Sequence, residues 1–103
     1  MERIAFKFKL KSGKLNEYIQ AHNNVWPEML NLLEKAGIFN YTIWNNGDEI
    51  FGYYETEDVC HASETVSQSE INTKWQKEMD KLRENARQEM NCVFSFKLTK
   101  SEG

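Results

Sequence analysis

The sequence contains a single proline and only two cysteines among its 103 residues. Cys60 and Cys92 lie far apart and form no CxxC pair, which argues against a zinc site and against a disulfide framework. The sequence also has no Gly-rich phosphate cradle, no nucleophile elbow and no metal-ligand spacing. Any chemistry that this protein performs is therefore expected to depend on proton transfer and on positioning of the substrate.

Charge of one sign is nowhere concentrated, and the net charge is −3. Without a basic run to follow a phosphate backbone, nucleic acid is not an expected partner. No apolar stretch is long enough to span a membrane, and the first segment, "MERIAFKFKLKSGK", interleaves lysines with apolar residues, unlike a signal peptide. We expect a single cytoplasmic domain over residues 1–103, with an aromatic content of 13% that favours a ring-binding site or an apolar interface.

The first forty residues show a strand pattern of apolar residues followed by a helical one. Ile4 to Leu10 alternate with period two, which predicts a strand. From Lys14 the period becomes helical, and Pro27 should interrupt this helix and start a second one, because its ring clashes with the helical carbonyl four residues earlier. Gly37 is a natural end for the second helix.

The rest of the chain predicts a hairpin, two helices and a final strand. Asn46-Gly47 is a strong turn signal between strands at about 40–45 and 49–55. A short helix is expected over 57–66 and a clearer one from Ile71 to Ala86, while residues 92–98 alternate again and predict the last strand.

The predicted order is therefore βαββαβ, which indicates an α+β, ferredoxin-like fold with an antiparallel sheet and helices on one face. Strand residues 50–54 (IFGYY) carry large side chains at both even and odd positions, which point to opposite faces of the sheet. Both faces should therefore be shielded from water. A second copy facing the sheet across a two-fold axis would provide this shield, and we expect a homodimer. The alternative is a monomer whose tyrosines face solvent.

His22 is the candidate proton carrier. Tyr18 and His22 are four residues apart and share a helical stripe at the margin of the core stripe. The break before Pro27 should leave polar backbone groups near His22, and such groups often line pockets. The ordinary pKa of histidine is close to neutral, which suits general acid–base chemistry. A structural histidine beside the core remains the alternative, and His61 is expected on the surface.

The segment "YIQAHNNVWPEMLNLLEKAGIFNYTIW", followed by "FGYYE" and "NTKWQKEM", resembles the L-rhamnose mutarotases over nearly the whole chain. The resemblance implies a dimeric α/β barrel of ferredoxin-like subunits that interconverts the α and β anomers of L-rhamnose without a metal or cofactor. By resemblance, His22 takes the proton-donor position and acts as general acid, and Tyr18 and Tyr41 take substrate-contact positions.

The family also uses two consecutive tryptophans on the last helix. Here the first is present as Trp75, which also lies on the apolar stripe of its helix, and the second is replaced by Gln76. Both are expected at the substrate, with Gln76 putting an amide in place of an aromatic wall, so the sugar is expected to be L-rhamnose or a related 6-deoxy or other pyranose sugar.

Two other functions fit the same sequence. One is a non-catalytic sugar-binding module that keeps the pocket without turnover. The other is a small dimeric-barrel monooxygenase, in which His22 would bind iron or polarise an aromatic substrate, since this fold supports several chemistries. Faster exchange between anomers would indicate the mutarotase, and sugar binding without it the binding module. Haem absorbance or oxygen uptake with an aromatic substrate would indicate the monooxygenase.

Overall fold

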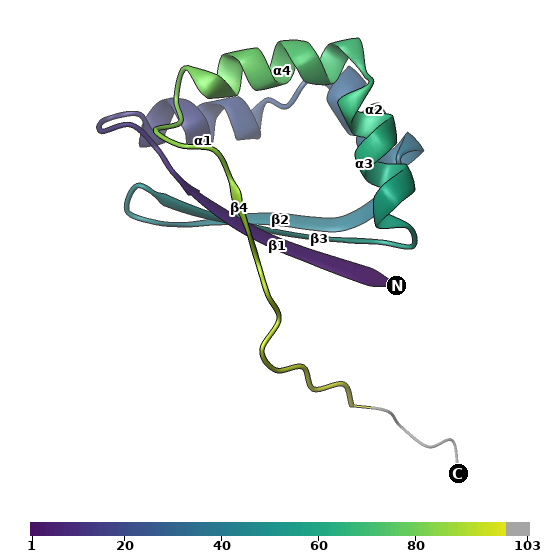
Figure 1. Ribbon diagram of the computed structural model, residues 1–103. Helices are drawn as coiled ribbons and strands as arrows, with labels where there is room; N and C mark the ends of the chain where they lie inside the picture. The colour runs from purple at the N-terminus through teal and green to yellow at the C-terminus, as the bar shows by residue number, and fades with distance from the viewer. Residues whose placement is uncertain (99–103) are drawn as a thin grey trace.

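The strands form one antiparallel sheet in the order β2-β3-β1-β4 in the computed structural model, which describes residues 1–98 (Figure 1). They span Glu2–Lys9 (β1), Ile38–Asn46 (β2), Glu49–Thr56 (β3) and Gln88–Met90 (β4). β1 and β3 pair along their whole length, from Glu2 opposite Thr56 to Lys9 opposite Glu49. The predicted hairpin is therefore confirmed, with β2 and β3 joined through Gly47 at a φ of 62°.

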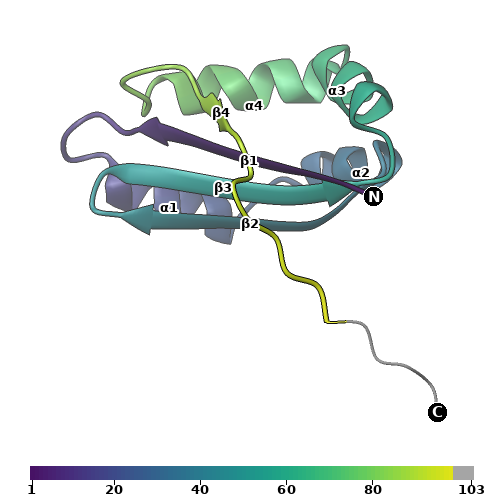
Figure 2. The same cartoon turned by 60° about the horizontal axis from the view of Figure 1, so that its bottom comes forward.

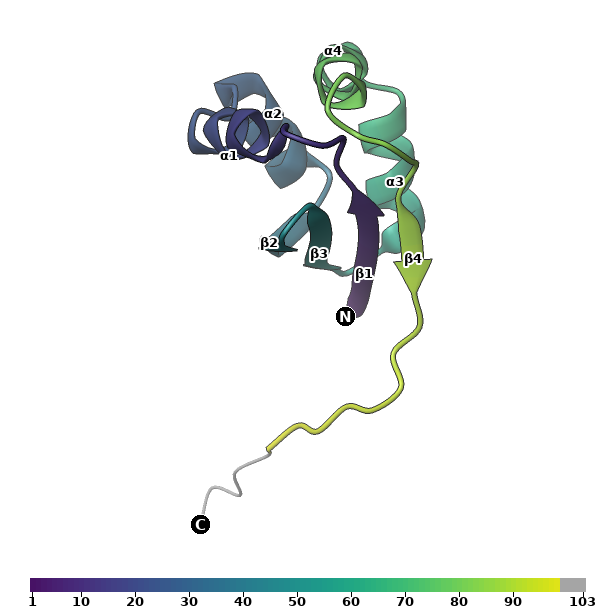
Figure 3. The same cartoon turned by 90° about the vertical axis from the view of Figure 1, so that its left-hand side faces the viewer.

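Four helices cover one face of this sheet (Figure 3). They span Leu15–Asn23 (α1), Pro27–Lys35 (α2), Val59–Ser67 (α3) and Glu70–Asp80 (α4). Pro27 occupies the first turn of α2, where a missing N–H does no harm, and Gly37 follows that helix with a φ of 75°. The predicted break and the predicted ferredoxin-like fold are both confirmed.

The core lies between the sheet and the helices. Phe6, Phe8 and Leu10 of the β1 region point into it, as their period-two spacing requires. Ile50 and Tyr54 of β3 lie on the same face, and the helices complete the core with apolar side chains that include Tyr18, Met29, Leu32, Trp75, Met79 and Leu82.

The Phe6 ring packs directly on the backbone of Gly52, which is the residue opposite Phe6 in the sheet. A Cβ atom on Gly52 would lie 2.1 Å from Cζ of Phe6, far inside van der Waals contact. A glycine is thus required here, because it lets the Phe6 ring approach the β3 backbone closely. This contact sets the height of the Phe6 ring above the sheet.

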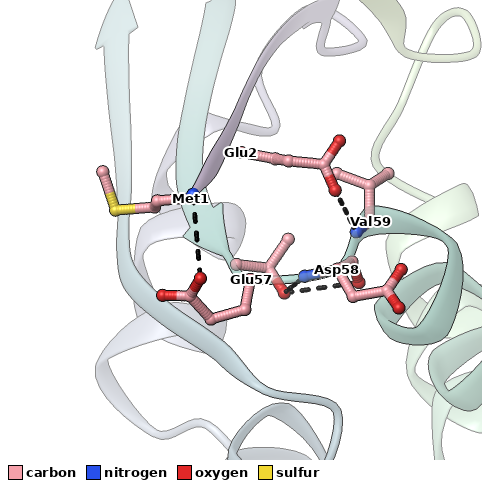
Figure 4. A network of polar contacts seen from close by, with 6 residues as sticks. Met1, Glu2, Glu57, Asp58 and Val59 are labelled. Atoms are coloured by element: carbon pink, nitrogen blue, oxygen red, sulfur yellow. Dashed lines mark hydrogen bonds and ion pairs between the residues drawn. The ribbon is translucent and has the colours of Figure 1, made fainter.

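Polar contacts tie the beginning of β1 to the beginning of α3 (Figure 4). The amino terminus of Met1 lies 3.7 Å from Oε2 of Glu57, and the Val59 backbone N–H donates to Glu2 at 2.8 Å. Within residues 1–98, no helix is both long enough and apolar enough to cross a bilayer.

The prediction that the last helix continues to Ala86 was wrong. α4 ends at Asp80, and the chain then returns to the end of β1, where Lys11 N–H donates to Leu82 and Glu84 N–H donates to Lys9, both at 2.8 Å. The apolar spacing extends past the helix because Leu82 is still buried. Its N–H donates to Met79 at the end of α4, and its carbonyl accepts from Lys11 beyond β1.

The prediction of a strand over 92–98 was also wrong. β4 comprises Gln88–Met90, opposite Ala5–Lys7, and the chain then runs away from the sheet (Figure 2). Met90 pairs with Ala5, so a longer antiparallel β4 would reach the first residue of the chain within four more residues. Alternation at 92–98 indicates one apolar face, but in this register β1 could pair with no more than the first residues of the segment, because Phe94 would already lie opposite Met1.

Candidate active site

A cavity of about 860 Å³ lies between the helical face of the sheet and the helices. Its volume is in the range of small-molecule sites, roughly 300–1,000 Å³. All five side chains predicted from the sequence line this one cavity, although they come from α1, β2 and α4: Tyr18, His22, Tyr41, Trp75 and Gln76.

His22 lies in the last turn of α1, half-buried between two aromatic rings. Its ring centroid is 4.2 Å from that of Tyr18 and 5.4 Å from that of Trp75, which it meets edge-on. Nδ1 lies 2.9 Å from the backbone oxygen of Tyr18. Because a carbonyl can only accept, Nδ1 carries the hydrogen, and Nε2 is left as the nitrogen able to exchange protons with a ligand.

Burial lowers the pKa of His22, and the hydrogen bond to the Tyr18 carbonyl opposes this effect only in part. The ring is therefore neutral at pH 7, with a lone pair on Nε2. In this state His22 can accept a proton, and it becomes a proton donor once it has gained one.

Tyr18 is buried, and its ring meets the Phe8 ring edge-on at 5.9 Å. Burial raises the pKa of Tyr18, so its hydroxyl stays protonated, although the charge of Arg83 opposes the shift. The hydroxyl makes no hydrogen bond to protein within residues 1–98. Every fully buried side-chain polar atom in this range has a hydrogen-bond partner, so the unpaired Tyr18 oxygen is not fully buried. The Tyr18 oxygen therefore remains accessible to a molecule in the cavity.

Tyr41 reaches the cavity because of a bulge in β2. The pairing with β3 shifts between Phe39 and Thr42, and Asn40 has a φ of 52°, in the left-handed region that asparagine tolerates. The extra residue keeps Tyr41 on the helical face, where it stacks on Tyr54 at 5.2 Å. Burial raises the pKa of Tyr41, against the opposing charge of Arg87, so this hydroxyl also stays protonated.

Trp75 and Gln76 bring different chemistry to the α4 wall. Trp75 is buried and meets the Trp26 ring edge-on at 5.1 Å, so it is part of the core and lines the cavity at the same time. Gln76 donates to Asn72 at 3.2 Å and accepts from Nη2 of Arg83 at 2.7 Å. This stretch of the wall is polar.

Two arginines that sequence reasoning missed also line the cavity, Arg83 and Arg87. The Arg83 guanidinium lies 5.5 Å from the Phe8 ring centroid, and that of Arg87 lies 4.3 Å from the Phe6 ring centroid. The spacing of Arg83 from Gln76, seven residues or about two helical turns, could have indicated that both lie on one side of the chain. No comparable signal points to Arg87, which follows the helix end.

His61 is exposed, as predicted, and its backbone N–H donates to the N-cap residue Asp58 at 3.1 Å. Within residues 1–98, no group of three His, Cys, Asp or Glu side chains is placed to hold a metal ion.

Comparisons with known proteins identify the family of this chain. The family model described as L-rhamnose mutarotase matches residues 3–96. The L-rhamnose mutarotase of Oceanobacillus iheyensis is 38% identical over 81 residues, which is 77% of each chain, and that of Listeria monocytogenes is 37% identical over the same share of each chain.

Solved structures show how far the fold extends beyond this family. An L-rhamnose mutarotase from Formosa agariphila superposes with a TM-score of 0.82 at 26% identity, over 94% of this chain and all of that chain. Tetracenomycin F2 cyclase from Streptomyces glaucescens superposes with a TM-score of 0.69 at 11% identity, over 96% of this chain and all of that chain, which shows a shared fold alone. With a family model covering almost the whole chain, this protein belongs to the L-rhamnose mutarotase family.

Proposed function

We propose that this protein is a sugar mutarotase that interconverts the α and β anomers of L-rhamnose or a closely related pyranose, with His22 moving the proton. Membership of the family supports the reaction, and the relatives named L-rhamnose mutarotase support the sugar. The single observation that supports His22 is the hydrogen bond from Nδ1 to the Tyr18 carbonyl, since it directs the proton exchange to Nε2 beside the cavity.

Ring opening of a pyranose removes the proton of the anomeric hydroxyl, breaks the bond between C1 and the ring oxygen, and places a proton on that oxygen. Both oxygens are bonded to C1, so one nitrogen can reach each in turn. Neutral His22 first accepts the hydroxyl proton at Nε2 and then, as the cation, donates to the ring oxygen. After the aldehyde rotates, the same steps run in reverse.

This scheme keeps the general-acid role of His22 and gives the same ring the role of base. A positioned acid or base of near-neutral pKa typically contributes about 10²–10⁴-fold to the rate. Water already catalyses the exchange slowly, so an acceleration of this size is sufficient for the proposed activity.

The aromatic side chains fit a sugar. A pyranose has apolar C–H faces and polar hydroxyls, and Trp75 offers an apolar ring while the protonated Tyr18 and Tyr41 hydroxyls can donate hydrogen bonds. In this proposal the three side chains and Gln76 bind substrate, and His22 carries out the proton transfer.

Saturation-transfer NMR between the α and β anomeric protons tests the activity directly, with L-rhamnose, L-fucose, L-lyxose and D-ribose as substrates. We expect acceleration with L-rhamnose or another sugar of this set. Line broadening that reports binding without any faster exchange would identify a non-catalytic sugar-binding module instead.

We also propose that the protein is a cytoplasmic homodimer. The face of the sheet opposite the helices is apolar in part, with Trp44 67% exposed and Phe51 and Tyr53 half-buried. Beyond β4, the chain exposes Phe94 at 82% and Phe96 at 75%, at the point where β1 offers no further pairing. A second copy would cover both surfaces.

Sedimentation velocity tests the dimer. Replacing both Phe94 and Phe96 by serine should shift the protein toward the monomer mass, while Lys97→Ser, a change in the same segment, should leave the mass unchanged. A wild-type protein that sediments as a monomer at all concentrations would contradict this part of the proposal.

A further inference from the structure

The side-chain amide of Gln76 is held at both ends. Its oxygen accepts from Nη2 of Arg83 at 2.7 Å, and its nitrogen Nε2 donates to Oδ1 of Asn72 at 3.2 Å. A guanidinium can only donate, so the oxygen end of the amide is the end that faces Arg83. The contact with Arg83 therefore determines the orientation of the amide, because turning the amide over would bring two donors together.

The nitrogen end of the same amide keeps one N–H group available. Nε2 carries two hydrogens, and Asn72 accepts one of them. No other group within residues 1–98 accepts from Nε2. Gln76 is half-buried, and it lines the cavity together with Asn72 and Arg83. In this orientation Gln76 can donate its second N–H to an oxygen atom of a molecule in the cavity.

The guanidinium of Arg83 is fixed by a second contact. The same Nη2 atom donates to Asp80 at 2.6 Å, and the Arg83 side chain is only 15% exposed. The guanidinium also lies 5.5 Å from the Phe8 ring centroid. Because Asp80 balances its charge, Arg83 can orient Gln76 without bringing a net charge to this wall of the cavity.

The backbone of Arg83 is fixed as well. It forms an isolated antiparallel bridge with Leu10, and its N–H donates to Met79 at 3.1 Å. The N–H of the next residue, Glu84, donates to Lys9 at 2.8 Å. Arg83 therefore extends from a rigid point of the fold and is a firm support for the amide that it holds.

We propose that Arg83 is a positioning residue of the active site, which orients the Gln76 amide so that Gln76 donates a hydrogen bond to the sugar. This inference rests on the proposed mutarotase function and gives Gln76 a donor role within it. Arg83 acts by ordering Gln76 before the sugar binds, which removes part of the entropy cost of binding. Its effect on the reaction therefore depends on the presence of Gln76.

A double-mutant cycle on kcat/KM, measured by saturation-transfer NMR with L-rhamnose, tests this dependence. Gln76→Met has an unbranched side chain of similar length without a donor, and it should lower kcat/KM about tenfold. Arg83→Met should lower kcat/KM about fivefold, as expected when a binding side chain is no longer ordered. The double variant should have the kcat/KM of Gln76→Met alone, since an absent amide needs no support.

Lys81→Met is the matched control for Arg83→Met. Lys81 is exposed, pairs with Glu78 at 3.1 Å and does not line the cavity, so its replacement should leave kcat/KM unchanged. If Arg83→Met does not fold, Arg83→Gln completes the same cycle, because its polar side chain ends two bonds short of the position of Nη2.

The NMR signals of the Gln76 side-chain N–H groups give a second readout, which a purely structural role of Arg83 would not change. Comparison with the spectrum of Gln76→Met assigns these signals. In the wild type, one of the two proton signals should shift when L-rhamnose is added. In Arg83→Met the same shift should be smaller at equal saturation, because the amide samples other orientations.

The outcomes separate this inference from the proposed function. If L-rhamnose exchanges no faster than in buffer, the proposed function fails for this sugar, and the Gln76 signals alone decide the positioning role. If the wild type accelerates exchange but the two losses multiply in the double variant, the mutarotase proposal stands and the positioning role of Arg83 is wrong. The role is also wrong if L-rhamnose leaves both Gln76 N–H signals unshifted.

Discussion

Gly52→Ala is the substitution whose consequence is clearest from the structure. The added Cβ would lie 2.1 Å from Cζ of Phe6 and 2.4 and 2.6 Å from its two Cε atoms. Ordinary contacts are 3.4–4 Å, so the ring has to move by more than 1 Å. Phe6 is only 3% exposed and stacks beside Phe8, but it also lines the active-site cavity, so a displaced ring would lose packing contacts and intrude on that cavity.

Forcing an extra carbon into such a packed site typically costs about 1–3 kcal/mol. For a domain of this size each kcal/mol lowers Tm by roughly 4–8 °C. Calorimetry and denaturant unfolding should therefore both report a clear loss of stability. Because Phe6 also supports Tyr41 edge-on at 6.4 Å and lies under Arg87, anomer exchange should slow as well.

The double variant Phe6→Leu with Gly52→Ala is the matched control. A leucine lacks the ring atoms that meet the new Cβ, so the double variant should lose less stability than the two single variants together. If Gly52→Ala has the unfolding free energy of the wild type, or if the two changes are additive, the account of this contact is wrong.

Three further predictions follow from the site. Asn40→Val should cost roughly 1–2 kcal/mol of unfolding free energy and weaken sugar binding, because a β-branched residue disfavours the φ of 52° that places Tyr41. Asn40→Gly should lose less unfolding free energy than Asn40→Val, and equal losses would contradict the bulge argument. Tyr18→Phe should keep its packing on Phe8 and its melting temperature but reduce kcat/KM about tenfold, and an unchanged value would remove the hydroxyl from the site. Because the folded pKa of His22 is lowered, protonation of His22 should reduce kcat/KM in acid, and kcat/KM should reach a plateau toward neutral pH. The contribution of His22 to the unfolding free energy should likewise be complete at neutral pH and fall as the pH drops below about 6.5 toward the folded pKa. His22→Gln should lack this component when unfolding is measured as a function of pH.

Local sequence patterns were sufficient for most of the fold. The period-two pattern of β1, the proline that separates α1 from α2 and the Asn46-Gly47 turn each reflect a short-range constraint, and each was predicted correctly. The final strand was not, because alternation at 92–98 shows that one face is apolar and says nothing about the length of the strand available to pair with it.

The cavity was predictable in part for the same reason. Tyr18 and His22 share a helical stripe, so local geometry relates them, whereas Trp75 and Gln76 were placed at the site by the resemblance to the family. Tyr41 reaches the same cavity only because of the Asn40 bulge, which no local pattern in β2 reveals. The spacing of Arg83 from Gln76 could have related these two residues, but the backbone of Arg83 is placed by a bridge to Leu10, more than seventy positions away, and the sequence contains no signal for that bridge.

The rate of exchange between the α and β anomers of L-rhamnose, measured by saturation transfer at neutral pH for wild type and His22→Gln, tests the role of His22 most directly. Glutamine has a similar size and can still bond to the Tyr18 carbonyl, but it cannot exchange protons near pH 7. We expect the enzyme-dependent rate to fall about 10²-fold or more while Tm stays close to wild type. A folded His22→Gln protein that exchanges the anomers at the wild-type rate would show that His22 does not move the proton.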